Sequence, residues 1–353
     1  KKGKFDDVAF KEPLYDGDDV HQTMTQFSSY SYDRWFSIHP DVDVQFRDAG
    51  HILGSATVTL RIRENGKTTH FGFSGDIGRP SRPILRDPQQ MPQLDYLICE
   101  STYGDKEHQG APEDLDQLLE VITDTCVKNQ GKLIIPAFSV GRTQEIVYML
   151  DQLENDDRLP EIPVYVDSPL SVNATVIFGS HPECFDEDLA EYMLIDPNPF
   201  GFNRLKYIKR TEDSKALNDD KGPAIIISSA GMINAGRIKH HVYNNIDKPQ
   251  NTILIVGYCS PGTPGGYLRE GVETLRLFGE WLPVKARVHV MDSFSAHADR
   301  LELLDFVRPH KQYLKNLFLV HGTLKKQKAF EDLLNQYGFD KVAIPELGQE
   351  YQL

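Results

Sequence analysis

Three short stretches of this sequence end an apolar run with a side chain that can bind a metal ion, followed by small residues. They contain His51 (in DAGHILGS), Asp76 (in FSGDIG) and His321 (in LVHGT). Polar side chains at strand ends build the sites of α/β proteins, and a neighbouring glycine lets a metal or phosphate approach the backbone. Each stretch alone also has a structural explanation, as a hydrogen-bonded histidine or a Gly-Asp turn. Together, the three predict a metal site.

Two further stretches suggest acid–base chemistry. Glu100 ends a short apolar run (in ICESTYGD), and His297 lies among small residues (in SFSAHAD). A buried carboxylate beside an imidazole raises the pKa of the imidazole and fixes its tautomer, which produces a general acid. The structural alternative is that Asp299 caps the helix that follows, and both interpretations can hold at once.

Candidate phosphate contacts lie where strands give way to helices. Ser228, Ser229 and Gly231 precede a predicted helix over 234–245, and Arg142 begins another predicted helix. Helix N-termini bind phosphate readily. Helix capping and surface solvation explain these residues equally well. The adjacent histidines at 240 and 241 lie inside the predicted helix and are interpreted as structural.

The elements that must position these residues begin with short strands. Residues 42–48 alternate in polarity, and residues 55–63 and 68–74 predict a hairpin around Asn65-Gly66, a favourable type I′ turn dipeptide. Residues 95–99 form an apolar run that predicts a buried strand. The polar ends of these strands are the stretches named above.

Strands and helices then alternate, which predicts βαβ units and a mostly parallel sheet. A helix with apolar residues at helical spacing runs from Leu115 to Cys126. Residues 183–222 are polar and irregular and predict long loops. Another βαβα unit is predicted from 287–291 to the end. The remaining predicted strands are 132–136, 163–166, 224–228 and 252–256, and the helices are 142–154, 170–179 and 234–245.

Bulk composition limits the class of protein. The 353 residues suit two domains, and 40% are apolar, enough for a sizeable core. The four cysteines form no C-x-x-C pair, so neither cysteine zinc sites nor a disulfide framework is expected. No apolar run reaches eighteen residues and no secretory leader opens the chain, so neither a membrane span nor secretion is expected. These features predict a cytoplasmic protein.

The formal net charge of −14 restricts how nucleic acid could bind. Proteins that hold nucleic acid through broad phosphate contacts are normally basic. Metal ions carry their own positive charge, so acidity does not exclude a nucleic-acid enzyme. Any binding groove must therefore be locally positive or metal-dependent.

The ordered set of His51, Asp76, Glu100, His297 and His321 resembles the metallo-β-lactamase-fold nucleases of the β-CASP family. The similarity covers nearly the whole chain and extends through four more stretches: PAFSVGRTQE (136–145), DSP (167–169), SSAGM (228–232) and GYCSPGT (257–263). The RNA-cutting members are most similar, such as the cleavage and polyadenylation endonuclease subunit and its bacterial homologues. The DNA-repair branch typically lacks the final histidine, so His321 favours RNA.

One difference from the family is large. Its H-x-H-x-D-H ligand motif is not found in residues 1–50, which contain only His21 and His39. We therefore expect an N-terminally incomplete lactamase-like domain, without its first strands and with a partial or absent metal centre. A smaller difference is Gly265-Gly266, because relatives often have an arginine after the glycine, and one phosphate contact is expected to be missing.

The resemblance implies an α/β fold, in which an αββα lactamase-like domain is interrupted by a β-CASP domain. Residues 1–105 and 293–353 would form the first and 106–292 the second, with single-stranded RNA between them. In the complete enzyme two zinc ions are implied. Asp76 would bridge them, His51 would bind one and His321 the other.

The resemblance also implies the reaction. A hydroxide would attack the phosphorus of the RNA backbone, and His297, oriented by Glu100, would protonate the leaving oxygen. The products would carry a 5′-phosphate and a 3′-hydroxyl, from endonuclease or 5′-exonuclease cleavage. The resemblance also admits a homodimer.

Two other functions remain open. A different metallo-β-lactamase-fold hydrolase would lack the inserted domain and the Glu100–His297 pair. A non-catalytic scaffold paralogue would fit the missing ligand motif, but such paralogues usually lose the scattered motifs too, and all five are intact here.

Overall fold

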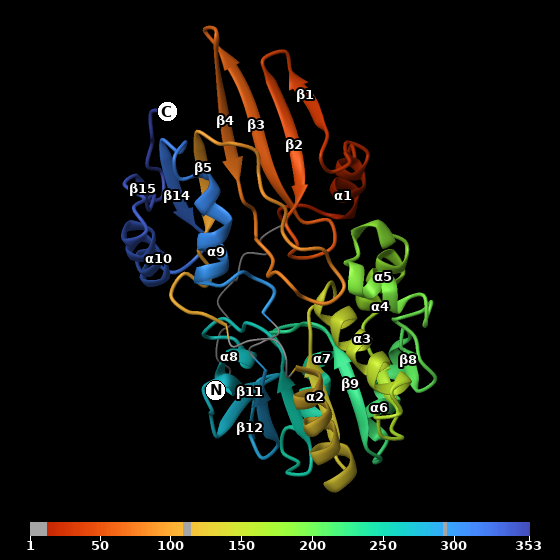
Figure 1. The fold of residues 1–353 in the computed structure, drawn as a ribbon. Coiled ribbons are helices and arrows are strands. Elements are labelled where there is room, and N and C mark those ends of the chain that lie inside the picture. Colours follow the sequence, from red (N-terminus) through yellow and green to blue (C-terminus); the bar gives the residue numbers. More distant parts are fainter. Residues whose placement is uncertain (1–12, 109–113, 292–294) are drawn as a thin grey trace.

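The computed structural model describes residues 13–108, 114–291 and 295–353, which form two α/β lobes, each built around one sheet (Figure 1). The first lobe holds a seven-stranded sheet whose strands come from both the early and the late parts of the chain. The second lobe holds a six-stranded sheet from the middle of the chain. The predicted α/β fold, with one α/β unit inserted into another, is confirmed.

The first sheet combines antiparallel and parallel strands. Its order is β1 (Trp35–His39), β2 (Val42–Asp48), β3 (Ala56–Glu64), β4 (Lys67–Phe73), β5 (Tyr96–Glu100), β14 (Asn316–Val320) and β15 (Val342–Ala343). Strands β1 to β4 pair antiparallel, and β4, β5, β14 and β15 pair parallel. The predicted hairpin is confirmed, because Asn65 (φ 50°) and Gly66 (φ 73°) both have the positive φ of a type I′ turn.

Two helices cover one face of this sheet, α9 (Arg300–Val307) and α10 (Leu324–Gln336) (Figure 1). Leu97 and Leu319 of the central strands share a fully buried cluster with Phe330 of α10. These contacts fix the parallel strands β5 and β14 side by side, and both strands end at candidate site residues.

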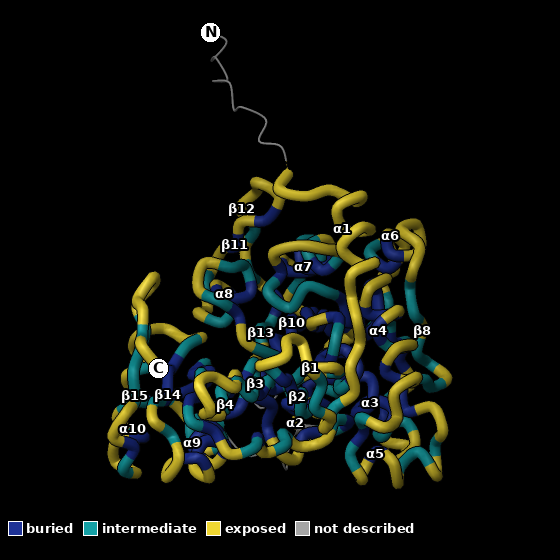
Figure 2. Tube along the Cα trace, turned by 90° about the horizontal axis from the view of Figure 1, so that it is seen from above, coloured by how far each residue is buried: buried dark blue, intermediate teal, exposed yellow. Residues whose placement is uncertain are grey.

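Helix α1 (Gly17–Met24) buries none of its residues and is drawn as exposed in Figure 2. Asp16 caps it by accepting from the backbone N–H groups of Asp18 and Asp19. In the described part of the chain, no helix has the length and apolar character needed to cross a membrane.

The second sheet is parallel throughout. Its order is β13 (Arg287–Val290), β10 (Thr252–Ile255), β6 (Lys132–Pro136), β9 (Ala224–Ser228), β7 (Val164–Val166) and β8 (Leu205–Tyr207). The central strands are buried on both sides, as expected when helices cover both faces.

The helices of the second lobe divide between the two faces. The helix α2 (Asp114–Ile122), which continues into η1 (Thr123–Lys128), packs with α3 (Arg142–Asn155) on one face. The helix α7 (Ile238–Asn245) and α8 (Pro264–Arg269) pack on the other. Also present are α4 (Pro169–Gly179), η2 (Pro182–Cys184), α5 (Glu187–Tyr192) and α6 (Thr211–Asp219), and a small hairpin of β11 (Thr274–Leu277) and β12 (Glu280–Pro283).

Two expectations about this region were wrong. Residues 183–222 are not only loops, because they supply α5, α6 and the edge strand β8. The expected C-terminal βαβα unit is not one unit either, because β13 pairs with β10 in the second sheet and β14 pairs with β5 in the first. The chain therefore passes from the second lobe to the first after β13 and before β14.

The parallel strands of the two sheets point toward each other. In Figure 1, β4 points down and β9 points up toward the region between the lobes. Close contacts join the loops there: a Cβ on Gly141 would lie 3.4 Å from the Ile52 side chain, next to His51. The carboxyl ends of parallel strands, where α/β sites form, therefore face this junction in both lobes.

Candidate active site

The candidate site residues lie at the ends of neighbouring strands. Asp76 follows β4, Glu100 ends β5 and His321 follows β14. Glu100 is paired in register with Val320, so the last two reach the same edge of the sheet. His297 joins them through an isolated bridge to Gly78. The sheet register thus brings residues more than two hundred positions apart into one cluster.

His51 and His321 approach opposite oxygens of the Asp76 carboxylate. His51 Nε2 lies 3.8 Å from Asp76 Oδ2, and His321 Nδ1 lies 3.4 Å from Asp76 Oδ1. The ligands of a tetrahedral zinc ion lie about 2.0–2.2 Å from the metal and so about 3.4 Å from one another. These spacings and donor types therefore fit cations held on either side of Asp76.

A four-residue group defines the centre of the site. Asp76, Glu100, His297 and His321 each offer one ligand atom, and these atoms lie within 4.8 Å of one another. The ring of His51 completes the cluster, with its centroid 4.5 Å from that of His297. Burial and the neighbouring His297 lower the pKa of His51. A lowered pKa favours the neutral imidazole, which is the form that binds metals.

Glu100 and His297 form a buried ion pair. His297 Nδ1 lies 3.1 Å from Oε2 and 3.3 Å from Oε1 of Glu100, whose side chain is only 1% exposed. Burial alone would lower the pKa of His297, but the hydrogen bond and charge of Glu100 outweigh it and hold that pKa above its usual value. The backbone N–H of Ile77 donates to the same carboxylate and fixes its position.

Backbone contacts lock the loops that carry these side chains. A Cβ on Gly78 would lie only 1.9 Å from the carbonyl oxygen of Gly50, so only glycine fits here. Gly78 N–H donates to Ala49 O, and Ala298 N–H donates to Ile77 O, both at 2.8 Å. The loops of His51, Asp76 and His297 are therefore held against one another.

His321 and Asp299 show how the strand and helix ends are shaped. His321 has a φ of 51°, a left-handed conformation that costs energy in a residue other than glycine. Asp299 caps α9 by accepting from the N–H groups of Leu301 and Glu302. The capping interpretation of Asp299, two positions after His297, is therefore confirmed.

The four candidate phosphate contacts belong to the second lobe, at and after the end of β9 and at the start of α3. Ser228 is buried and donates to the carbonyl oxygen of Asp167, and Ser229 Oγ lies 2.7 Å from Ser168 Oγ. The helix expected from 234 begins only at Ile238, so Ser228, Ser229 and Gly231 do not form its first turn.

Arg142 begins α3 as predicted, but it is buried and paired with Glu145. The surface-solvation alternative for Arg142 is therefore wrong.

Two neighbours of the cluster had no signal in the sequence. His108 Nε2 lies 3.1 Å from the carbonyl oxygen of His297, and its ring lies 4.5 Å from that of Tyr103. Burial lowers the pKa of His108 to about 4. His108 does not follow the end of a strand, and Tyr103, although it follows β5 among small residues, does not carry a usual metal-binding side chain.

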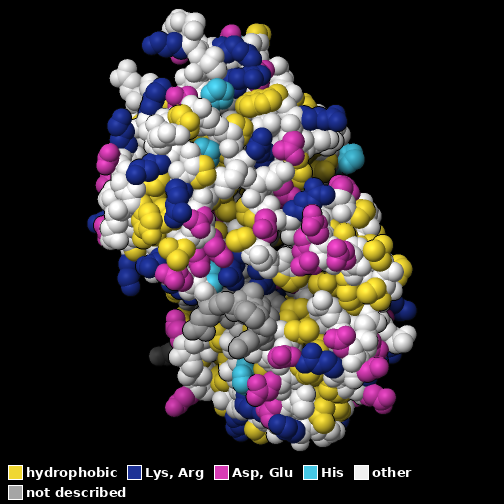
Figure 3. Space-filling view, viewed as in Figure 1, with side chains coloured by type: hydrophobic (Ala, Val, Ile, Leu, Met, Phe, Trp, Pro, Cys, Tyr) yellow, Lys and Arg dark blue, Asp and Glu magenta, His cyan; other side chains and the backbone are white. Residues whose placement is uncertain are grey.

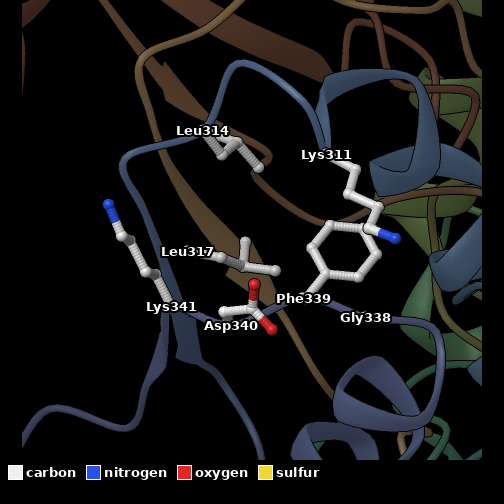
Figure 4. A pocket seen from close by; sticks show the side chains of 7 residues that line it. All are labelled: Lys311, Leu314, Leu317, Gly338, Phe339, Asp340 and Lys341. Atoms are coloured by element: carbon white, nitrogen blue, oxygen red, sulfur yellow. The ribbon is translucent and has the colours of Figure 1, made fainter.

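A separate cavity of about 100 Å³ lies elsewhere in the first lobe (Figure 4). Leu317 lines it near the start of β14, whereas His321 follows the end of that strand. The cavity is therefore distinct from the candidate site. Its lining residues are Lys311, Leu314, Leu317, Gly338, Phe339, Asp340 and Lys341.

Comparison with known proteins supports the resemblance to the β-CASP family. Residues 143–268 match the Beta-Casp domain, and residues 281–345 match the Zn-dependent metallo-hydrolase RNA specificity domain. A protein named ribonuclease from Thermus thermophilus is 32% identical over 96% of this chain and 75% of its own length. An RNase J-like protein from Methanocaldococcus jannaschii is 32% identical over 90% of this chain and 72% of its own length.

A longer relative covers nearly as much of this chain. The transcription termination factor FttA of Methanosarcina mazei is 31% identical over 93% of this chain. The chain spans 52% of that relative's length.

Proposed function

Because the chain belongs to the β-CASP family of metallo-β-lactamase-fold nucleases, we propose that it hydrolyses phosphodiester bonds in single-stranded RNA with zinc as its metal. One observation carries the proposal: Asp76 lies between the imidazoles of His51 and His321, directly beside the Glu100–His297 pair. The products carry a 5′-phosphate and a 3′-hydroxyl.

The metal would be held by three side chains, one from each of three loops. Asp76 directs one carboxylate oxygen toward His51 and the other toward His321, so these three side chains would hold the metal together. Bound metal ions in such a site activate water for attack and neutralise charge on the phosphoryl oxygens. The three residues fix where the reacting phosphate must sit.

His297 is the general acid. Its Nδ1 faces Glu100, so the proton on the other ring nitrogen, Nε2, is the one available to the leaving oxygen. Its raised pKa keeps it protonated at higher pH than an ordinary histidine. Glu100 acts by orienting the ring and by stabilising its positive charge.

RNA binds at the junction of the lobes, where the carboxyl ends of the parallel strands face each other. The proposed lactamase-like domain comprises 1–105 and 293–353, and the β-CASP domain comprises 106–292. Sheet membership supports this division, because β1 to β5, β14 and β15 share one sheet and β6 to β10 and β13 share the other.

Two further assignments remain proposals. A cytoplasmic location is supported by the four cysteines, which are all free thiols. A homodimer is supported by the open side of the first sheet, where β1 is an edge strand and its Ile38 side chain is 63% exposed.

Replacing the proposed acid tests the function. We expect His297→Ala to slow cleavage of single-stranded RNA by about 10²–10⁴-fold, the range for loss of a general acid, with zinc content unchanged. The matched control is His39→Ala. His39 is exposed and pairs with the start of β2, whereas the site residue His51 follows the opposite end of that strand, so His39 lies away from the site. A His297→Ala protein with full activity would exclude this role.

A non-catalytic scaffold is the second candidate function. It is favoured by the donor count: among the described residues, His51, Asp76 and His321 alone are proposed ligands for two metals, whereas catalytic zinc normally has three protein ligands each. We therefore expect the 353-residue chain to retain fewer than two zinc ions after dialysis. Elemental analysis that finds two stoichiometric zinc ions, together with RNA cleavage, would exclude the scaffold.

A further inference from the structure

Beside the candidate active site, two tyrosine rings from different lobes meet around a lysine. Tyr103 follows β5 and Tyr258 lies in the loop after β10, with their ring centroids 6.4 Å apart and nearly perpendicular, at 84°. The Nζ atom of Lys326 lies 4.9 Å from the Tyr103 centroid and 5.3 Å from the Tyr258 centroid. Edge-to-face and cation–π contacts are both attractive, so this arrangement holds the Tyr258 ring in one orientation.

The two rings differ in exposure. Tyr103 is 4% exposed, whereas Tyr258 is 40% exposed. Tyr258 therefore combines a fixed orientation with an open surface. Proteins that bind single-stranded nucleic acid use such rings as platforms on which bases stack, independently of sequence.

The position of Tyr258 relates it to the reacting bond. The Tyr103 ring neighbours both Tyr258 and the acid, with its centroid 6.3 Å from that of His297. His297 must reach the leaving oxygen, so the nucleotide that carries this oxygen is the one closest to the tyrosines. We infer that Tyr258 stacks on the base of that nucleotide, immediately 5′ of the cut. The inference rests on the proposed function and names a binding subsite of it.

Positive charge accompanies the rings. Lys106 Nζ lies 5.0 Å from the Tyr103 centroid, so two ammonium groups approach this ring. Lys326 is tied down by donating to the carbonyl oxygen of Thr102 at 2.7 Å. In a chain with a net charge of −14, these lysines give the phosphates beside the stacked base a locally positive surface. We call Tyr103, Tyr258, Lys106 and Lys326 the tyrosine cluster.

Packing between the lobes is the alternative explanation of Tyr258. A packing residue contributes to stability but shows no energetic coupling to one particular base of the RNA. Stacking predicts that coupling, so altering the protein and the RNA together distinguishes stacking from packing.

The test combines protein variants with RNA that lacks single bases. Binding of labelled single-stranded RNA is measured with metal chelated, so the reading does not depend on activity. We expect Tyr258→Ala to weaken binding by roughly 5- to 150-fold, the range for loss of one stacked base, and Tyr258→Phe to bind within about twofold of the parent. Tyr313→Ala is the matched control, because Tyr313 is 43% exposed and precedes β14, away from its His321 end.

The position of the missing base decides the outcome. An abasic site immediately 5′ of the cut should weaken binding to the parent protein by the same factor, and should weaken Tyr258→Ala no further. Equal losses for both proteins at that position would overturn the inference, as would coupling found only 3′ of the cut. A parent protein that neither binds nor cuts RNA overturns the proposed function as well, whereas one that cuts RNA without the coupling overturns this inference alone.

Discussion

Replacing the buried carboxylate of Asp167 should lower the free energy of unfolding of the second lobe strongly. The Asp167 side chain is fully buried after β7 and accepts three hydrogen bonds. The donors are Ser214 Oγ at 2.5 Å, His241 Nε2 at 2.6 Å and Arg237 Nη1 at 2.7 Å. The backbone oxygen of Asp167 also accepts from Ser228, which ends β9. One residue thus joins several segments of the lobe.

The Asp167→Asn variant keeps the shape of the side chain but removes its charge. The guanidinium of Arg237 and the fully buried ring of His241 lose their negative partner. Breaking a buried pair on one side costs roughly 3–5 kcal/mol, because the remaining charge loses its counter-ion. We therefore expect the free energy of unfolding to fall by about that amount.

Urea denaturation at neutral pH measures this loss. The control is Asp116→Asn, because Asp116 is 73% exposed and pairs with the partly exposed Arg158, so its loss should cost no more than about 1 kcal/mol. A matching cost for the two variants would refute the argument that Asp167 anchors the lobe.

The pH dependence gives a second check. Burial alone would raise the pKa of Asp167, but the hydrogen bonds from its three donors outweigh burial and lower it. A lowered folded-state pKa contributes stability above the unfolded pKa of about 3.9, and this contribution is lost as the pH falls through the folded value. The difference between parent and Asp167→Asn should therefore persist at neutral pH and shrink below about pH 4. A difference that grows on acidification would contradict this sign.

Three further outcomes can be measured. Gly78→Ala should lose zinc and activity together, because its Cβ would lie 1.9 Å from the oxygen of Gly50, whereas Gly179→Ala, with no neighbour within 4 Å, should lose neither. Glu100→Gln should slow cleavage by about 10²-fold at unchanged zinc content, the lower end of the range for general acids, because the imidazole remains. Binding of single-stranded RNA should depend weakly on salt, with a log–log slope of about −1.4 if the two lysines of the tyrosine cluster each neutralise one phosphate.

Much of the candidate site could be predicted because its signals are local. His51, Asp76 and His321 each follow an apolar strand and have small neighbours, and these features are visible without any knowledge of contacts. The structure supplies the spacing that the sequence cannot, such as the register that aligns Glu100 with Val320. The Asn65-Gly66 hairpin was predictable for the same reason, because turn chemistry is a property of two adjacent residues.

The errors arise where distant contacts decide. Strands β13 and β14 are both short and β-forming, and only their pairing partners place them in different sheets. The late start of α7 has a similar cause. Gly236 has a φ of 75° and packs so closely that a Cβ would lie 2.4 Å from the carbonyl oxygen of Ser229. The loop is folded back on the end of β9, so helical residues before Ile238 are excluded.

The acidic composition and an RNA substrate are compatible because binding here need not rely on broad electrostatics. Acidic and basic side chains are interspersed on the face shown in Figure 3, and the chain carries a net charge of −14. Metal bound beside Asp76 would supply concentrated positive charge at the reacting phosphate, and Tyr258 would supply a contact that is insensitive to charge. Long-range attraction to any polyanion would then be weak, while RNA between the lobes would meet both features at once. Acidity therefore favours release of strands that do not reach the site, which suits an enzyme that cuts RNA without coating it.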